Sequence, residues 1–165
     1  MQTQSSRQDD RRSKRSVLGP FSEVSELMRR PVTASPHNTV KEAVVVMAKH
    51  GVDAMPVVDA QKRLIGSISH QGIAVRASTG DRPVHELRVC DAMSSDATSV
   101  SVSATVSDAL SLMVQRRSSW LPVVTRDRLV VGMLALSDIV SRAASARDSR
   151  GAWLETGYRP AWGRS

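Results

Sequence analysis

The chain has 165 residues, 41% of them hydrophobic and 24% charged, which suits one ordinary domain or two very small ones that share a core. Aromatic residues make up only 3%, so we expect an aliphatic core with few stacking platforms for single-stranded nucleic acid. The net charge of +7 gathers toward both ends of the chain. It leaves two interpretations open, namely solvated tails that keep the protein soluble, or contact with nucleic acid or an acidic partner.

Several function classes lack their sequence signals. Cys90 is the single cysteine, which excludes an intramolecular disulfide and a cysteine-based zinc site and fits a reducing cytoplasm. No apolar run approaches the length of a membrane span. The N-terminus has no apolar region before a cleavage site, so we expect no secretory signal. We find no nucleophile–base arrangement and no glycine-rich phosphate loop. The sequence therefore predicts a cytoplasmic protein that is not an enzyme and requires no cofactor. Its histidines show no metal-ligand spacing: His37, His50, His70 and His85.

The first part of the chain is polar. Residues 1–19 are charged and without periodicity, and they are predicted to be a disordered basic tail. The folded part is expected to open on a short helical turn at 24–28, which is echoed at 89–93. A short extended piece should follow each turn, at 31–33 and at 97–100.

A helix is predicted next in each half. Thr39 and Glu42 have the spacing of a capping box, and Gly51 is placed to end that helix. Thr105 and Asp108 repeat the arrangement. Methionines on the apolar face of each helix are interpreted as core residues.

One motif then occurs twice. Residues 54–59 read Ala-Met-Pro-Val-Val-Asp, and residues 120–125 read Trp-Leu-Pro-Val-Val-Thr, 66 positions later. A repeated unit of this length indicates two copies of one fold. Each motif is expected to be a buried strand that forms a hairpin with the strand at 64–68 or 130–134. Gly66 and Gly132 lie inside these second strands, where glycine lets another backbone or a ligand come close.

Each copy should close with a helix, from His70 to about residue 77 and from Leu136 to about residue 146. Residues 78–83 are rich in small and turn-forming side chains and are predicted to link the copies. The end of the chain carries arginines and most of the aromatic residues. The predicted organisation is a basic tail at 1–19, one repeat at 20–80, a second at 84–146 and an Arg- and Trp-containing tail at 147–165.

These features resemble the CBS domain, named after cystathionine β-synthase. The resemblance covers about residues 22–145 and rests on the doubled Pro-Val-Val strand, each followed by a glycine strand at the same spacing. It implies an α+β fold of two β-α-β-β-α repeats, a Bateman module, packed about a pseudo-twofold axis. It also implies two clefts between the repeats for adenosine-containing ligands, and a homodimer formed through helices. The chain looks like the free-standing bacterial CBS-pair proteins.

The family's ligand signature is a Ser or Thr followed three positions later by Asp, at the start of the closing helix. The resemblance assigns the ribose hydroxyls to the Asp carboxylate and a phosphate to the hydroxyl and the helix N-terminus. The first copy has Ser69 but Gly72 in place of the Asp, and the second has Asp138 but Ala135 in place of the hydroxyl. This asymmetry predicts one principal nucleoside site, the cleft with Asp138.

The resemblance builds each cleft from both copies. The main cleft combines the signature region of the second copy with segments of the first, with Val32 and Met55 as apolar walls for adenine. Asp53 would repel a polyphosphate there, which favours adenosine, AMP or S-adenosylmethionine over ATP. The implied residues are Val32, Thr33, Asp53, Ala54, Met55, Pro56, Ala135, Leu136, Ser137 and Asp138.

The second, degenerate cleft would use Ser69, Thr98, Ser119, Trp120 and Leu121, with His70 within reach of a phosphate. Trp120 stands where the family has a small residue, and two interpretations stay open: it stacks on a base, or it plugs a cleft that has lost its ribose anchor.

The sequence thus favours a regulatory protein that binds AMP, ATP or S-adenosylmethionine and acts on an unknown partner. The alternatives are a dimeric scaffold without ligand, and basic tails that contact nucleic acid.

Overall fold

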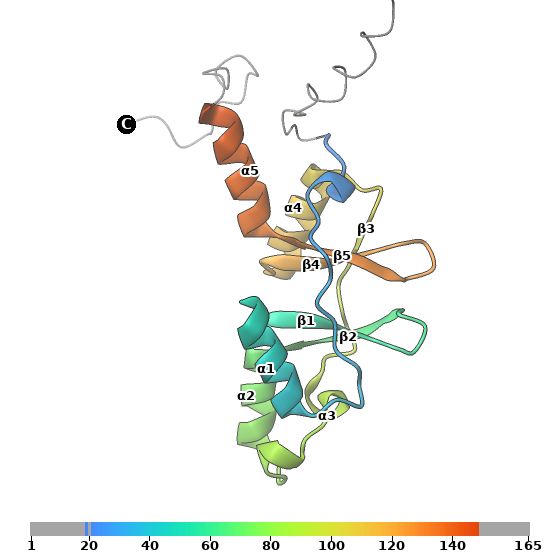
Figure 1. Ribbon diagram of the computed structural model, residues 1–165, viewed down its shortest axis with the longest axis vertical. Helices are drawn as coiled ribbons and strands as arrows, with labels where there is room; N and C mark the ends of the chain where they lie inside the picture. The colour runs from blue at the N-terminus through green and yellow to red at the C-terminus, as the bar shows by residue number, and fades with distance from the viewer. Residues whose placement is uncertain (1–18, 20, 149–165) are drawn as a thin grey trace, which may run out of the picture.

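The computed structural model describes residue 19 and residues 21–148, so most of the predicted basic tail and the Arg- and Trp-containing tail lie outside the described residues. Within the described part, two small sheets face each other at the middle of the molecule (Figure 1). The four longest helices stand along one edge, and the hairpin turns lie at the opposite edge. This mixed helix-and-sheet arrangement confirms the predicted fold class.

The two copies contain corresponding elements. The first consists of the 3₁₀ helix η1 (Val24–Glu26), helix α1 (Val40–His50), strands β1 (Ala54–Val58) and β2 (Leu64–Ser69), and helix α2 (His70–Thr79). The second consists of η2 (Val84–Glu86), α3 (Val89–Ala92), β3 (Val100–Ser101), α4 (Val106–Arg116), β4 (Trp120–Val124), β5 (Val130–Ala135) and α5 (Leu136–Asp148).

In each copy, the extended segment before the first long helix, α1 or α4, is shorter than the first strand that a β-α-β-β-α repeat implies. In the second copy, β3 has only two residues and pairs in parallel with β4. In the first copy, a single bridge joins Ala34 to Val57, with hydrogen bonds of 3.0 and 2.9 Å to the backbone of β1. Pro31 and Pro36 flank Ala34, and neither has an N–H with which to extend the pairing.

Capping interactions fix where α1 and α4 begin. The Thr39 hydroxyl accepts from the Glu42 N–H at 3.1 Å, and the Glu42 carboxylate accepts from the Thr39 N–H at 2.9 Å. The backbone hydrogen bond from Thr39 is the main cause that lowers the pKa of Glu42. Asp108 caps α4 in the same way, and its pKa is also lowered, chiefly by the hydrogen bond from the Thr105 hydroxyl. Both predicted capping boxes are confirmed.

The opening turn of each copy packs on the core of the other copy. Val24 is fully buried in the second core, defined by Val24, Val100, Val106, Ala109, Met113, Leu121, Val123, Leu134 and Ile139. Leu87 and Val89 are buried in the first core, defined by Ala34, Val40, Ala43, Met47, Met55, Val57, Ile68, Ile73, Leu87 and Val89. Backbone hydrogen bonds of 2.9 Å fix both crossings, from the Val24 N–H to the Ala104 carbonyl and from the Val40 N–H to the Leu87 carbonyl. The two repeats therefore share their cores.

The strand glycines lie at these crossings. A Cβ on Gly66 would stand 2.6 Å from the Ser94 carbonyl oxygen, which confirms the predicted approach of another backbone. A Cβ on Gly132 would meet the Met28 side chain instead, 2.5 Å from its sulfur. Each glycine thus admits the segment that follows the opening turn of the other copy.

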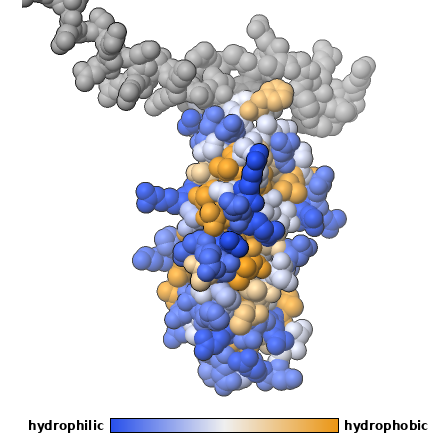
Figure 2. Space-filling view, turned by 90° about the vertical axis from the view of Figure 1, so that its right-hand side faces the viewer, coloured by the Kyte–Doolittle hydropathy of each residue, from blue (hydrophilic) through white to orange (hydrophobic). Residues whose placement is uncertain are grey.

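The two hairpins also join each other near their turns. The Leu64 N–H donates to the Arg128 carbonyl at 2.9 Å, and the Val130 N–H donates to the Lys62 carbonyl at 3.0 Å. Figure 2 shows this edge of the molecule, where hydrophilic side chains project to both sides of a central apolar area. These hydrogen bonds hold the two sheets together at the edge away from the helices.

Candidate functional site

The start of each Pro-Val-Val strand lies beside the signature of its own copy. Ala54 stands opposite Ser69 in the register of β1 and β2, and Trp120 stands opposite Ala135 in that of β4 and β5. The signature of one copy and the strand start of the other lie on facing sheets (Figure 1). The predicted clefts would lie where these two sheets face each other.

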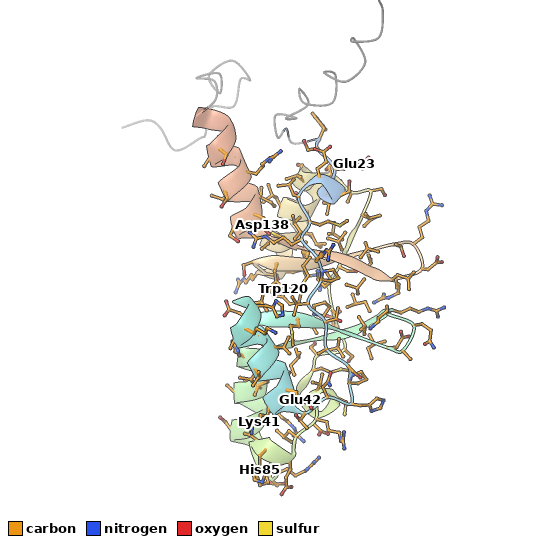
Figure 3. The ribbon with its side chains drawn as sticks, in the orientation of Figure 1. Glu23, Lys41, Glu42, His85, Trp120 and Asp138 are labelled. Carbon is orange, nitrogen blue, oxygen red and sulfur yellow. The ribbon has the colours of Figure 1, made fainter. Side chains whose placement is uncertain are left out.

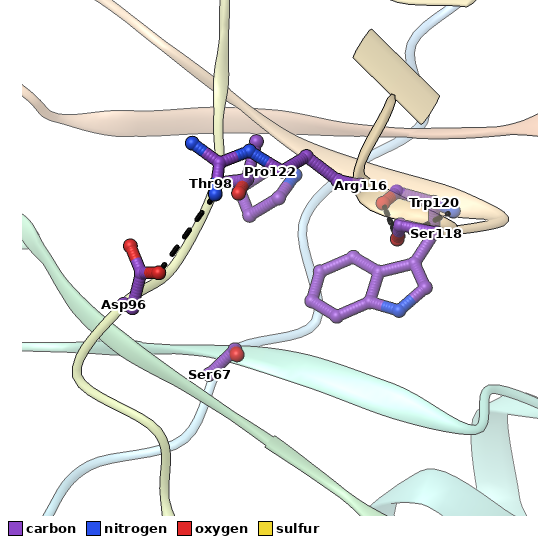
Figure 4. Close-up of a pocket in the computed structure, with 7 residues that line it drawn as sticks. All are labelled: Ser67, Asp96, Thr98, Arg116, Ser118, Trp120 and Pro122. Atoms are coloured by element: carbon purple, nitrogen blue, oxygen red, sulfur yellow. Dashed lines mark hydrogen bonds and ion pairs between the residues drawn. The ribbon is translucent and has the colours of Figure 1, made fainter. Parts of the chain in front are cut away.

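A pocket of about 260 Å³ opens between the copies beside Trp120 (Figure 4). The half-buried indole points from β4 toward Ser67 on β2. An ion pair joins Arg116 Nη1 to Asp96 Oδ2 at 3.9 Å within the pocket lining. The Trp120 side chain therefore leaves open space between the copies. The lining consists of Ser67, Asp96, Thr98, Arg116, Ser118, Trp120 and Pro122.

Two of the residues predicted for the degenerate cleft, Thr98 and Trp120, are thus brought together in this pocket. Ser119 and Ser69 are not in its lining. Instead, the Ser119 carbonyl accepts from the Leu136 N–H at 2.8 Å, and the Ser69 hydroxyl accepts from the Gly72 N–H at 3.1 Å. Leu121 is 1% exposed and belongs to the second core.

Three residues of this pocket have equivalents in the first copy, 66 positions earlier, all of which were predicted to line the main cleft. The equivalents of Thr98, Trp120 and Pro122 are Val32, Ala54 and Pro56. Val32 is half-buried, while Ala54 and Pro56 are buried in β1. Met55, the predicted second wall, is fully buried in the first core, so its side chain is a packing residue in this structure.

The polar residues expected around the main cleft are more accessible. The Asp53 side chain is fully exposed, and its carboxylate lies 3.7 Å from Nδ1 of His70 at the start of α2. Thr33 is half-buried, and Leu136 and Ser137 on the first turn of α5 are exposed. Asp53 can therefore present its negative charge to a ligand at this end of β1.

Asp138 is the only buried charged residue in the described part of the chain, at 8% exposure. It lies on the first turn of α5, above Trp120 (Figure 3). One carboxylate oxygen, Oδ1, pairs with the Arg29 guanidinium, and the other accepts from the Ala135 N–H at 3.4 Å. The predicted ribose anchor thus already has two protein partners.

The two damaged signatures share one local geometry, because a Ser and an Asp three positions apart can form a capping box. Ser69 supplies the hydroxyl half of that box to α2. Asp138 supplies the carboxylate half to α5 through Ala135. Each copy therefore has one of the two capping hydrogen bonds: the hydroxyl bond in the first copy and the carboxylate bond in the second.

A second pocket, of about 280 Å³, lies beside Asp138 between the η1 segment and α5. Asp138 is the only residue of the predicted main cleft in its lining. The sequence prediction missed Arg29 here and Arg116 beside Trp120. Aligning the two copies shows only that Arg29 occupies the position of Ser94 and Asp138 the position of Gly72, so that the base and the acid both occur in one half; it does not show that they touch. The lining consists of Glu26, Leu27, Arg29, Asp138, Ser141, Arg142 and Ser145.

Within residues 19–148, apart from Pro20, no group of three or more His, Cys, Asp or Glu side chains could hold a metal ion. Among the helices of that same part, none is both long and apolar enough to cross a bilayer.

Comparison with known proteins identifies the family. The sequence profile of the CBS domain matches residues 24–76 and again residues 89–145. The chain belongs to the CBS domain family. The two matches cover the two copies recognised from the repeat, and the shared cores make them a CBS pair.

Named relatives agree with this assignment. The chain is 36% identical over 124 residues to the CBS domain-containing protein YhcV of Bacillus subtilis, covering 72% of this chain and 84% of YhcV. It is 32% identical over 127 residues to inosine-5'-monophosphate dehydrogenase of Methanocaldococcus jannaschii, covering 74% of this chain but only 24% of that enzyme. The chain therefore matches about a quarter of the dehydrogenase.

Solved structures show the same fold. The putative acetoin utilization protein AcuB of Vibrio cholerae has a TM-score of 0.70 at 27% identity, covering 78% of this chain and 94% of that one. The CBS domain pair of protein MJ0100, in complex with 5'-methylthioadenosine and S-adenosyl-L-methionine, has a TM-score of 0.66 at 24% identity, covering 76% of this chain and 98% of that one.

Proposed function

We propose that this CBS pair is a regulatory module that binds an adenosine-containing ligand in the cleft with Asp138 and modulates a partner protein. The observation that carries the proposal is the buried Asp138 carboxylate at the start of α5. A carboxylate accepts hydrogen bonds from two neighbouring hydroxyls, which is the pattern that a ribose offers. The MJ0100 pair, which has the same fold, binds two adenosyl compounds.

The negative charge of Asp53 disfavours a ligand with several phosphates. Asp53 is fully exposed at the start of β1, so it would repel a polyphosphate that passes this point. Adenosine, AMP and S-adenosylmethionine are therefore favoured over ATP.

Regulation would follow from differential affinity. A ligand changes the arrangement of the protein only if it binds two arrangements with different affinity. Because the two copies exchange their opening turns, a ligand that holds both sheets also holds both cores. A partner that binds one arrangement of the pair would then sense the ligand.

Ligand-dependent thermal stability tests the proposal. A ligand at a hundred times its Kd adds about 2.7 kcal/mol, which corresponds to about 5–10 °C in Tm for a chain of this size. Asp138→Asn should abolish the shift, whereas Asp127→Asn, in the exposed turn of the second hairpin, should preserve it. Absence of a shift with adenosine, AMP, S-adenosylmethionine, ATP and NADH would contradict the proposal.

We also propose a homodimer that forms along the helical edge. The four long helices that stand along this edge (Figure 1) each carry an exposed apolar residue. Val45 on α1, Val75 on α2, Val114 on α4 and Val140 on α5 are 56–78% exposed. Burying apolar side chains is the main driving force of association. Val114→Asp combined with Val140→Asp should yield monomers in sedimentation velocity, whereas Val131→Asp on β5 should leave the dimer intact.

One observation favours the alternative of a scaffold without ligand. Both remaining signature residues are engaged within the protein, Ser69 with Gly72 and Asp138 with Ala135 and Arg29. Under this alternative, Asp138→Asn would lower stability while the dimer persists and no nucleoside changes Tm.

A further inference from the structure

Arg29 and Asp138 form an ion pair that connects the two copies. Arg29 follows the opening turn of the first copy, and its backbone exchanges hydrogen bonds of 2.8 and 3.0 Å with Met133 on β5. This anchoring places its guanidinium against Asp138 Oδ1 on α5. The Asp138 side chain is 6% exposed, whereas that of Arg29 is 74% exposed. The Asp138 carboxylate is therefore held in place, while the Arg29 guanidinium can move into solvent.

The other half of the molecule lacks both members of this pair. Ser94 takes the place of Arg29 and exchanges two hydrogen bonds of 2.8 Å with Ser67, as Arg29 does with Met133. Gly72 takes the place of Asp138, and a Cβ there would already lie 3.3 Å from the Ala92 carbonyl oxygen. The backbone frame is thus common to both halves, and the acid and the base occur together in one of them.

We propose that Arg29 is a specificity-determining residue of the Asp138 cleft: it competes with the ligand for the carboxylate and, once displaced, favours ligands that carry an anionic group. The inference rests on the proposed function, because it assumes that the ligand takes Asp138. A ribose needs both carboxylate oxygens to receive its two hydroxyls, and Arg29 holds one of them.

The pocket beside Asp138 gives the displaced guanidinium a place to go. Its volume is about 280 Å³, and Glu26 in its lining offers a second carboxylate. From this position Arg29 remains next to the cleft and attracts a phosphate, whereas an uncharged nucleoside gains nothing from it. Arg29 therefore weakens the binding of adenosine and compensates for that loss with AMP.

Titration calorimetry on the full chain with adenosine and with AMP tests the inference. Arg29→Gln should bind adenosine about fivefold tighter than wild type, because breaking an ion pair with one exposed partner weakens a binding constant by about this factor. It should bind AMP with equal or lower affinity, so that the preference for AMP falls by about fivefold or more. Arg30→Gln, a change at the neighbouring exposed arginine, should leave both affinities within about twofold.

The outcomes separate this inference from the proposed function. If wild type binds but Arg29→Gln has the same preference for AMP, the inference is overturned and the proposed function stands. If neither protein binds adenosine or AMP, the inference is overturned, and the proposed function is overturned with it only if S-adenosylmethionine, ATP and NADH also leave Tm unchanged. If Arg29→Gln binds adenosine and wild type does not, the result supports the proposed function and the inference, because competition by Arg29 for Asp138 then accounts for the lack of binding by wild type.

Discussion

Replacing Gly66 with alanine tests the exchanged arrangement of the two copies directly. The added Cβ would lie 2.6 Å from the Ser94 carbonyl oxygen, whereas carbon–oxygen contacts lie near 3.3 Å or more, so Ser94 must retreat by about 0.7 Å. That retreat stretches its two 2.8 Å hydrogen bonds with Ser67 beyond the usual range. Losing most of two backbone hydrogen bonds costs about 2 kcal/mol, and the stiffer unfolded chain offsets about 0.5–1 kcal/mol.

The expected net loss is therefore roughly 1–1.5 kcal/mol, which lowers the urea midpoint by about 0.5 M. Gly132→Ala is the matched control, because its Cβ would meet the half-buried Met28 side chain rather than backbone, with the Met28 Cγ at 2.9 Å and its Cβ at 3.0 Å. That variant should lose less than about 1 kcal/mol, and adding Met28→Ala should cost less in it than in wild type. A Gly132→Ala variant that is destabilised as much as Gly66→Ala would refute this reasoning.

Three further predictions concern the helices and the exchanged turns. Arg117→Gly should raise the free energy of unfolding in urea by about 0.5–1 kcal/mol, because its φ of 51° is a left-handed angle that Gly51 supplies in the first copy; a loss would contradict this. The lowered pKa of Glu42 stabilises the protein above the unfolded-state pKa of about 4.3, and this contribution disappears as the pH falls through the lower folded value. Wild type and Glu42→Gln should thus converge in stability toward pH 3, and an equal gap at pH 3 and pH 7 would exclude the effect. Val24→Ala should cost about 2 kcal/mol and shift one common unfolding transition, not create an early separate one.

Local patterns predicted most of the elements. The capping box of Thr39 and Glu42 and the αL position of Gly51 depend on a few neighbouring residues, so the sequence alone located both ends of α1. The doubled Pro-Val-Val motif located β1 and β4 and led to the family. The predicted limits of the two repeats stay predictions. Each core contains residues of both repeats, so the cores do not mark where one repeat ends and the other begins.

Interactions between distant segments were harder to foresee. The apolar character of Val24 and Val89 indicates burial, but it does not say in which copy each is buried. Family resemblance led to Thr98 and Trp120 in one pocket, yet it gave no sign that Arg29 engages Asp138. That contact depends on the backbone of Arg29 being held by Met133, which follows from the tertiary arrangement and not from any short motif.

The exchanged opening turns impose an order on folding during synthesis. When residues 24–80 have emerged from the ribosome, the first core still lacks Leu87 and Val89, so it cannot close. Val24 is synthesised early, but it can be buried only after α4 and the last strand, β5, have been synthesised. The first core has all its members once residues 87–89 emerge, but at ordinary elongation rates Val24 stays uncovered for seconds longer, until β5 is made. The opening turn of the first copy should therefore be the last part of that copy to become ordered.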